Sequence, residues 1–323
     1  MIKNRKIIII VGTILAIIII TVFVFLYQFS APQRNAEEER IVVNSTTTTT
    51  ELISKLKEQG YIRNIWAFKF ALKNGEIRPG GYKISKSMNA WKMAKILTSE
   101  PYMKWVVIPE GLRKEQIAEI LTKELNWNEQ QKSDWIKKYT AMKSDYIEGV
   151  YFPDTYLIPK DENGLEIAQR FVNKFNEEFA PYSDKFTQAN IKWTTALKIA
   201  SLIQREAGSK DDMPLIAGII WNRLSKDMKL EIDATLQYAR GDTGNGWWSP
   251  INVLDKQTDS PYNTYLNKGL PPHPICNPGI DAIDAVLNPT ETDCLYYLHD
   301  SNRQIHCAVT YEEHKANIEK YLK

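Results

Sequence analysis

The chain contains little cysteine and little histidine, and its charge is almost balanced. Its three cysteines are too few, and odd in number, for a disulfide-built scaffold. The 41 basic and 39 acidic residues give no electrostatic basis for binding nucleic acid. The four histidines lack His-Glu-x-x-His spacing, paired-cysteine motifs are missing, and Gly-x-Ser-x-Gly is absent. We therefore expect no metal, no cofactor, no serine nucleophile and no nucleic-acid partner.

A long apolar run lies close to the N-terminus. Residues 7–27 are interrupted only by one glycine and two threonines, and they approach the roughly 20 residues that cross a bilayer. Lys3, Arg5 and Lys6 precede the run, which predicts a cytoplasmic N-terminus, residues 1–6, and an extracytoplasmic remainder. The alternative is a cleaved signal peptide, but the run is long and no small-x-small site follows it. We expect a single-pass plasma-membrane anchor.

The rest of the chain is long enough for two folded parts. Residues 28–50 carry a charge cluster and a Ser-Thr tract, which predict a linker. The remainder, about 270 residues, exceeds one typical domain. We expect an α+β protein with an N-terminal subdomain at 51–145 and a second, mixed α+β domain at 146–323.

An internal echo organises the predicted subdomain. Two apolar helix patterns, 91–97 and 115–121, share Ala, Ile and Leu at matching places. Each follows a short strand-like run, 82–84 or 105–108. The order of strand, turn and helix resembles the LysM glycan-binding module, although many α/β segments have this spacing.

One carboxylate stands out in an apolar helix pattern. Glu206 ends the segment Ile199-Ala-Ser-Leu-Ile-Gln-Arg-Glu, three residues after Ile203 and seven after Ile199. A carboxyl group on that apolar face is partly desolvated, which raises its pKa and suits it to act as a general acid. The alternative is a helix-edge glutamate that reaches water or Arg205.

Polar and aromatic residues crowd two further segments. Residues 146–156 and 249–279 are rich in Tyr, Trp, Asn, Asp, Pro and Gly. Such mixtures form ordered loops along clefts, and aromatic faces with amide groups suit a carbohydrate. Stiff loop packing without a ligand is the alternative.

Seven motifs in order carry a family resemblance. They are Ile108-Pro-Glu-Gly-Leu112, Ile147-Glu-Gly-Val-Tyr-Phe-Pro-Asp-Thr-Tyr156, the segment 199–206, Trp221-Asn-Arg-Leu224, Ser260-Pro-Tyr-Asn-Thr-Tyr265, Gly269-Leu-Pro-Pro272 and Pro274-Ile-Cys-Asn-Pro-Gly279. Together they resemble the MltG (YceG-like) endolytic murein transglycosylases, from about residue 82 to the C-terminus. The resemblance implies cleavage of the β-1,4 bond between N-acetylmuramic acid and N-acetylglucosamine inside peptidoglycan strands, leaving 1,6-anhydro ends. It also implies association with peptidoglycan synthases, the penicillin-binding proteins.

The resemblance places the catalytic role on Glu206, as both acid and base, because the sugar's own primary hydroxyl attacks. We expect Asp233, Tyr262 and Asn263 to contact substrate. Further candidates for substrate contacts are Glu148, Asn222 and Arg223. Glu110 is more often a structural residue in such a turn, and His306 and His314 are weaker candidates.

The chain departs from the family pattern at three places. Gln204 stands where an acid is common, His273 where glycine is common, and Ala234 where proline is common. Gln204 leaves open a non-enzymatic alternative, a membrane-anchored glycan-binding scaffold of the wall-synthesis machinery. Cys294 and Cys307 could pair across a predicted hairpin, but a turn at Ser301-Asn302 would not place them directly opposite.

Overall fold

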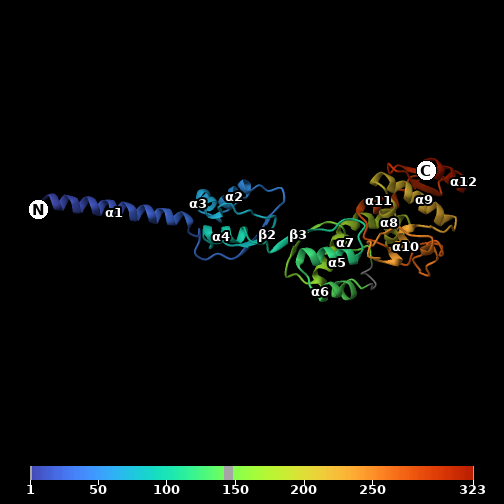
Figure 1. Ribbon diagram of the computed structural model, residues 1–323, viewed down its shortest axis with the longest axis horizontal. Coiled ribbons are helices and arrows are strands. Elements are labelled where there is room, and N and C mark those ends of the chain that lie inside the picture. The colour runs from blue at the N-terminus through green and yellow to red at the C-terminus, as the bar shows by residue number, and fades with distance from the viewer. Residues whose placement is uncertain (1, 142–147, 323) are drawn as a thin grey trace. The chain divides into compact units, whose positions relative to one another are not determined.

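The computed structural model describes residues 2–141 and 148–322 and confirms a mixed α+β protein (Figure 1). It contains two compact units. Unit 1 comprises Met1–Trp105 and Tyr156–Asp161, and unit 2 comprises Val106–Thr155 and Glu162–Lys323. The predicted domain boundary at residues 145 and 146 lies outside the described residues and stays a prediction.

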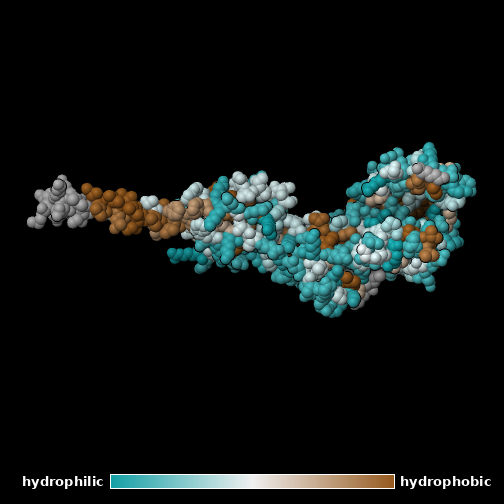
Figure 2. Space-filling view, viewed as in Figure 1, coloured by the Kyte–Doolittle hydropathy of each residue, from teal (hydrophilic) through white to brown (hydrophobic). Residues whose placement is uncertain are grey.

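Unit 1 begins with the long helix α1 (Ile2–Phe29). Its stretch Ile10–Phe29 has a mean hydropathy of 2.9, and its side chains form a brown band in Figure 2. At 1.5 Å per residue, 20 residues extend about 30 Å, the thickness of a bilayer's hydrocarbon core. The helix is therefore long and apolar enough to span a membrane, which agrees with the span expected at residues 7–27.

The body of unit 1 combines a sheet with three helices. The sheet has the order β1 (Glu39–Val43), β2 (Gly80–Ile84), β3 (Met103–Val107) and β4 (Thr155–Pro159), and β2 is antiparallel to both β1 and β3. The helices are α2 (Thr49–Glu58), α3 (Ile65–Leu72) and α4 (Ala90–Leu97). Strand β1 lies inside the predicted linker 28–50. This part of the predicted linker is folded, since Val43 joins the buried core.

The echo seen in the sequence is a real repeat of secondary structure. Strand β2 precedes α4, and β3 precedes α5 (Lys114–Leu125), as expected. The second helix, however, belongs to unit 2. A relationship of unit 1 to LysM modules stays a prediction.

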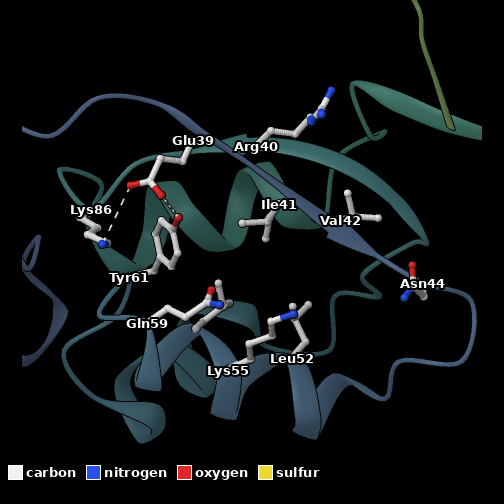
Figure 3. A pocket seen from close by; sticks show the side chains of 11 residues that line it. Glu39, Arg40, Ile41, Val42, Asn44, Leu52, Lys55, Gln59, Tyr61 and Lys86 are labelled. Atoms are coloured by element: carbon white, nitrogen blue, oxygen red, sulfur yellow. Dashed lines mark hydrogen bonds and ion pairs between the residues drawn. The ribbon is translucent and has the colours of Figure 1, made fainter.

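A pocket of about 580 Å³ lies between β1 and α2 in unit 1 (Figure 3). The hydroxyl of Tyr61 donates a 2.7 Å hydrogen bond to Glu39, whose carboxylate also lies 3.9 Å from Lys86. Burial and the Glu39 carboxylate raise the pKa of Tyr61 to about 12, so the hydroxyl keeps its proton. Lys55 of α2 and Gln59, the residue after that helix, face the same space.

Unit 2 is mainly helical. After α5 it contains α6 (Glu129–Asp134), the π-helix η1 (Trp135–Tyr139), α7 (Gly164–Gln188), α8 (Trp193–Glu206), the 3-10 helix η2 (Lys210–Asp212), α9 (Met213–Ser225), α10 (Asp233–Arg240), the 3-10 helix η3 (Leu254–Gln257), α11 (Ile280–Leu287), β5 (Tyr296–His299), β6 (Ile305–Ala308) and α12 (Tyr311–Tyr321). Helices α8, α9 and α11 pack together (Figure 1). Their contact buries apolar side chains such as Ile203, Ile216 and Ile283, which fixes the C-terminal end of α8.

The predicted hairpin is present near the C-terminus. Strands β5 and β6 are antiparallel, with Tyr297 opposite Cys307. Cys294 lies just before β5 and is disulfide-bonded to Cys307. The two cysteines are not directly opposite each other in the β5–β6 pairing, as expected from the turn at Ser301-Asn302. Their Cα atoms are nevertheless 5.9 Å apart, a separation that a disulfide can bridge.

Candidate active site

Glu206 is the last residue of α8. The turns before it are anchored by Ile199, Leu202 and Ile203, whose side chains are fully buried. The residue as a whole is partly buried. Its Oε2 accepts a 2.6 Å hydrogen bond from the hydroxyl of Tyr297 on β5. The hairpin therefore holds the Glu206 carboxyl group in place at the end of α8.

The surroundings of Glu206 favour its protonated form. Burial raises the pKa of the Glu206 carboxyl group, and the nearby charge of Asp233 raises it further. Three groups act in the opposite direction: the Tyr297 hydroxyl, the charge of His299 and the backbone N–H of Ala234. The net result is a raised pKa. A carboxyl group of this kind can donate a proton and then be stabilised as an anion by the same three neighbours.

A second carboxylate approaches from the start of α10. Asp233 is exposed, and its Oδ1 accepts a 2.5 Å hydrogen bond from the hydroxyl of Tyr265. Burial and this carboxylate raise the pKa of Tyr265, so its hydroxyl stays a donor. The structure thus brings the predicted residues Glu206 and Asp233 together, each paired with a tyrosine.

A histidine–aspartate pair, His299 and Asp212, borders the site and was missed by the sequence analysis. His299 Nε2 lies 3.2 Å from Oδ2 of Asp212, which also accepts a 3.0 Å hydrogen bond from the backbone N–H of Ser209. A side chain at Gly208 would lie close to both partners. Tyr297 and His299 are two residues apart on β5, so they share one face. The alternation of side chains along β5 could have shown that Tyr297 and His299 lie on one face, but nothing in the sequence indicated that this face meets Glu206.

Two predicted substrate residues hold the hairpin in place. The Asn222 amide donates to the carbonyls of Thr292 and Cys294, at 2.6 and 3.1 Å. Arg223 is buried, and it donates to the carbonyls of Leu295 and Leu230 at 2.6 and 2.7 Å. Because these groups already bind backbone carbonyls, both residues support the strand that carries Tyr297.

Two other predicted residues lie in the loop between α10 and α11. Asn263 is fully buried, and its amide donates to the carbonyls of Lys256 and Thr258. Tyr262 packs on Tyr238 with ring centroids 4.8 Å apart. Asn263 therefore shapes the loop that carries Tyr265, while a substrate contact of either residue stays a prediction.

Glu148 lies in a buried hydrogen-bond cluster. Its Oε1 accepts from the backbone N–H of Lys114 at 3.0 Å and from the amide of Asn277 at 2.8 Å. Its other oxygen, Oε2, is buried without a hydrogen-bond partner among the described residues. Burial raises the pKa of Glu148 to about 8. The side chain is 1% exposed, so its predicted substrate contact would require the cluster to open.

The two weaker histidine candidates lie elsewhere in unit 2. His306 Nε2 is 3.0 Å from Asp300, and its ring stacks on Tyr321. His314 stacks on Tyr296, with ring centroids 5.4 Å apart. Both have structural partners of their own.

Comparison with known families identifies one whose model covers most of the chain. The model of the YceG-like family matches residues 41–320, which include both tyrosine-paired carboxylates. The chain belongs to the YceG-like family.

This YceG-like chain is similar to several named proteins and to a protein of known crystal structure. An endolytic murein transglycosylase of Bacillus subtilis is 30% identical over 296 residues, covering 84% of this chain and 81% of that protein. One of Streptococcus pneumoniae is 29% identical over 309 residues, covering 84% of this chain but 56% of that protein. The chain thus spans little more than half of the streptococcal relative. The crystal structure of a yceG-like protein of Listeria monocytogenes has a TM-score of 0.58 and 27% identity, covering 87% of this chain and 99% of that one.

Two departures of this YceG-like chain have structural consequences. Gln204 donates from Nε2 to Glu110 at 3.3 Å and accepts from the backbone N–H of Gly279 at 2.9 Å. An acid at this position could accept the second bond but could not donate the first. The second departure is Ala234, whose backbone N–H interacts with the Glu206 carboxyl group. A proline at this position would lack that N–H.

The third departure, His273, lies in a partly buried loop position. Burial lowers the pKa of His273, and the charge of Lys198 lowers it further. The imidazole is therefore expected to be neutral near pH 7.

Proposed function

We propose that this chain is a membrane-anchored endolytic transglycosylase that cuts peptidoglycan strands at the β-1,4 bond after N-acetylmuramic acid. The observation that carries this proposal is the Glu206 carboxyl group at the end of α8, which accepts a hydrogen bond from Tyr297 and has a raised pKa. Named relatives support the substrate class. The product would carry 1,6-anhydromuramic acid ends.

In the first step, protonated Glu206 acts as the general acid. It donates its proton to the glycosidic oxygen, the bond from that oxygen to the anomeric carbon breaks, and positive charge develops on the sugar ring. The carboxylate of Asp233 is close enough to raise the pKa of Glu206, so it can also stabilise that positive charge. Tyr265 orients Asp233 through its hydrogen bond.

In the second step, the Glu206 carboxylate acts as the general base. The primary hydroxyl of the muramic acid attacks its own anomeric carbon, and its proton passes to Glu206, which restores the starting state. No water is consumed, so one carboxyl group serves both proton transfers. The Tyr297 hydroxyl and the Ala234 N–H stabilise the intermediate carboxylate.

Each unit has a pocket with room for part of the glycan. In unit 2, a pocket of about 830 Å³ is lined by Trp247 and Trp248. The Trp248 ring lies 4.0 Å from the guanidinium of Arg205, the neighbour of Glu206. In unit 1, the pocket between β1 and α2 supports the proposal that residues 51–145 form a LysM-like glycan-binding subdomain.

The apolar helix α1 supports the proposed location. We propose that it anchors the chain in the plasma membrane with residues 1–6 in the cytoplasm, because Lys3, Arg5 and Lys6 precede it. The catalytic unit would then face the cell wall, where penicillin-binding proteins are the proposed partners.

The deciding experiment is digestion of uncrosslinked peptidoglycan by the full-length protein in detergent, beside Glu206→Gln. We expect new ends lighter by one water than reducing ends, and none with the variant. Hydrated reducing ends would mean that water attacks and that Asp233 is a second catalytic carboxylate. Binding without cleavage would favour the non-catalytic scaffold.

A further inference from the structure

The last turns of α1 are packed against helices α3 and α4 of unit 1. Phe29 is 5% exposed and stacks on Trp91 of α4, with ring centroids 5.5 Å apart. Trp66 of α3 meets the edges of Phe25 and Phe29, with centroids 5.7 and 6.0 Å apart. The end of the apolar helix is thus part of the unit 1 fold.

Arg63 fixes the direction in which the chain leaves α1. Its guanidinium donates to the Tyr27 hydroxyl at 2.8 Å and to the carbonyls of Ala31 and Pro32 at 3.0 and 3.1 Å. It also lies over the Tyr27 ring, 4.3 Å from the centroid. Because these contacts bind both the helix and the chain after it, the sheet and helices of unit 1 cannot swing freely about the end of α1.

These contacts determine the depth of α3 and α4 relative to a bilayer. When the stretch ending at Phe29 fills the hydrocarbon core, Phe29 lies at its outer boundary and Phe25 lies about 6 Å deeper. Trp66 touches both rings, so it must lie at that boundary too.

Helices α3 and α4 also expose large apolar side chains. Trp66 is 53% exposed, Phe70 54%, Trp91 44% and Ile65 37%. Such a group of exposed apolar residues is costly in water, whereas tryptophan is enriched at membrane interfaces. Lys69, Lys92 and Lys95 are exposed on the same two helices and complement anionic headgroups.

We propose that Ile65, Trp66, Phe70 and Trp91 form a docking face that inserts into the outer boundary of the phospholipid bilayer. The inference rests on the membrane anchoring within the proposed function and adds a second membrane contact to it. The sheet and helices α2 to α4 of unit 1 then lie on the membrane surface, instead of being joined to α1 by a flexible tether at residues 28–50.

The test uses the full chain reconstituted into vesicles of phosphatidylcholine and phosphatidylglycerol, with an environment-sensitive thiol label. Cys276 is buried and the other two cysteines are disulfide-bonded, so introduced cysteines are the reactive sites. The variants are Ile65→Cys and Trp66→Cys on the docking face. Val42→Cys is the matched control, because Val42 is an apolar residue of the same unit that is 40% exposed. Ile65→Cys keeps every aromatic ring of the face.

Quenching by lipids that carry a spin label close to the headgroup reports the contact. We expect such lipids to lower the emission from positions 65 and 66 about twofold or more, and to leave position 42 nearly unchanged. Equal quenching at the three positions, in vesicles that carry the protein through flotation, would overturn the docking face alone. Failure of the protein to float with the vesicles would overturn the anchoring as well.

Discussion

The hydroxyl of Tyr297 donates a 2.6 Å hydrogen bond to the carboxyl group of Glu206, joining residues 91 positions apart in the chain. The bond favours the ionised carboxyl group, while burial favours the neutral one and prevails. Tyr297 therefore limits how far the pKa of Glu206 rises. The disulfide and the contacts of Asn222 and Arg223 hold the strand that positions this hydroxyl.

Removing the hydroxyl with Tyr297→Phe should raise the pKa of Glu206. A hydrogen bond to a charged group contributes about 1.5–3 kcal/mol, which corresponds to about one pKa unit or more. Since the acid step needs protonated Glu206, and activity falls as pH rises through its pKa, the alkaline limb should move to higher pH. The pH profile of glycan cleavage measures this change, together with a lower maximum rate.

Tyr296→Phe is the matched control for that experiment. Tyr296 is the preceding residue of β5 and therefore faces the other side, where its ring packs on Tyr311 and His314. Its pH profile should match that of the unmodified protein. An equal displacement of the limb in both variants would show that Tyr297 acts only through the stability of the hairpin.

Ala234→Pro should act on the same carboxyl group through the backbone. Proline removes the N–H directed toward Glu206 and is tolerated in the first turn of a helix. The pKa of Glu206 should rise, moving the alkaline limb upward by up to about one pH unit. Ala234→Gly keeps the N–H and should leave the limb in place. An unchanged limb in a properly folded proline variant would show that this N–H contributes nothing.

Gln204→Glu should destabilise unit 2 at neutral pH. The new carboxylate would replace a hydrogen-bond donor and lie beside Glu110, and like charges at this distance cost about 1 kcal/mol near a surface. Thermal unfolding measures the loss. Adding Glu110→Gln restores a donor and an acceptor and should recover most of the stability in a double-mutant cycle. Additive effects of the two substitutions would contradict a direct interaction.

Glu148→Gln should change how stability depends on pH. The folded protein holds the Glu148 proton up to a pKa of about 8, above the ordinary 4.5, so stability falls as pH rises from about 4.5 to 8. A pKa difference of one between the folded and unfolded states corresponds to about 1.4 kcal/mol, and we expect a loss of a few kcal/mol across this window. The variant keeps an acceptor for Lys114 and should lack this loss.

Thermal unfolding at pH 5 and pH 8 tests the Glu148 prediction. The variant should melt near the unmodified protein at the lower pH and above it at the higher one. A variant that is destabilised equally at both values would show that Glu148 is ionised in the folded protein.

Local patterns were predictable where neighbouring residues carry the information. The apolar spacing from Ile199 to Glu206 predicted a helix with a partly desolvated carboxyl group, and α8 has that form. The turn residues near Ser301 predicted the β5–β6 hairpin. The roles of Asn222 and Arg223 in holding the hairpin were not predictable, because the carbonyls they bind there lie about 70 residues away and carry no signature in the sequence.

The sequence by itself determined the apolar helix at the N-terminus, the α+β composition, the family motifs and the placement of Glu206 on an apolar helix face. These depend on length, periodicity and residue type, all of which are local. The tertiary structure alone decided which groups surround that carboxyl group, since Asp233, Tyr297 and His299 come from α10 and β5. It likewise brought Trp66 and Trp91 to the end of α1, because packing, unlike periodicity, joins residues far apart in the chain.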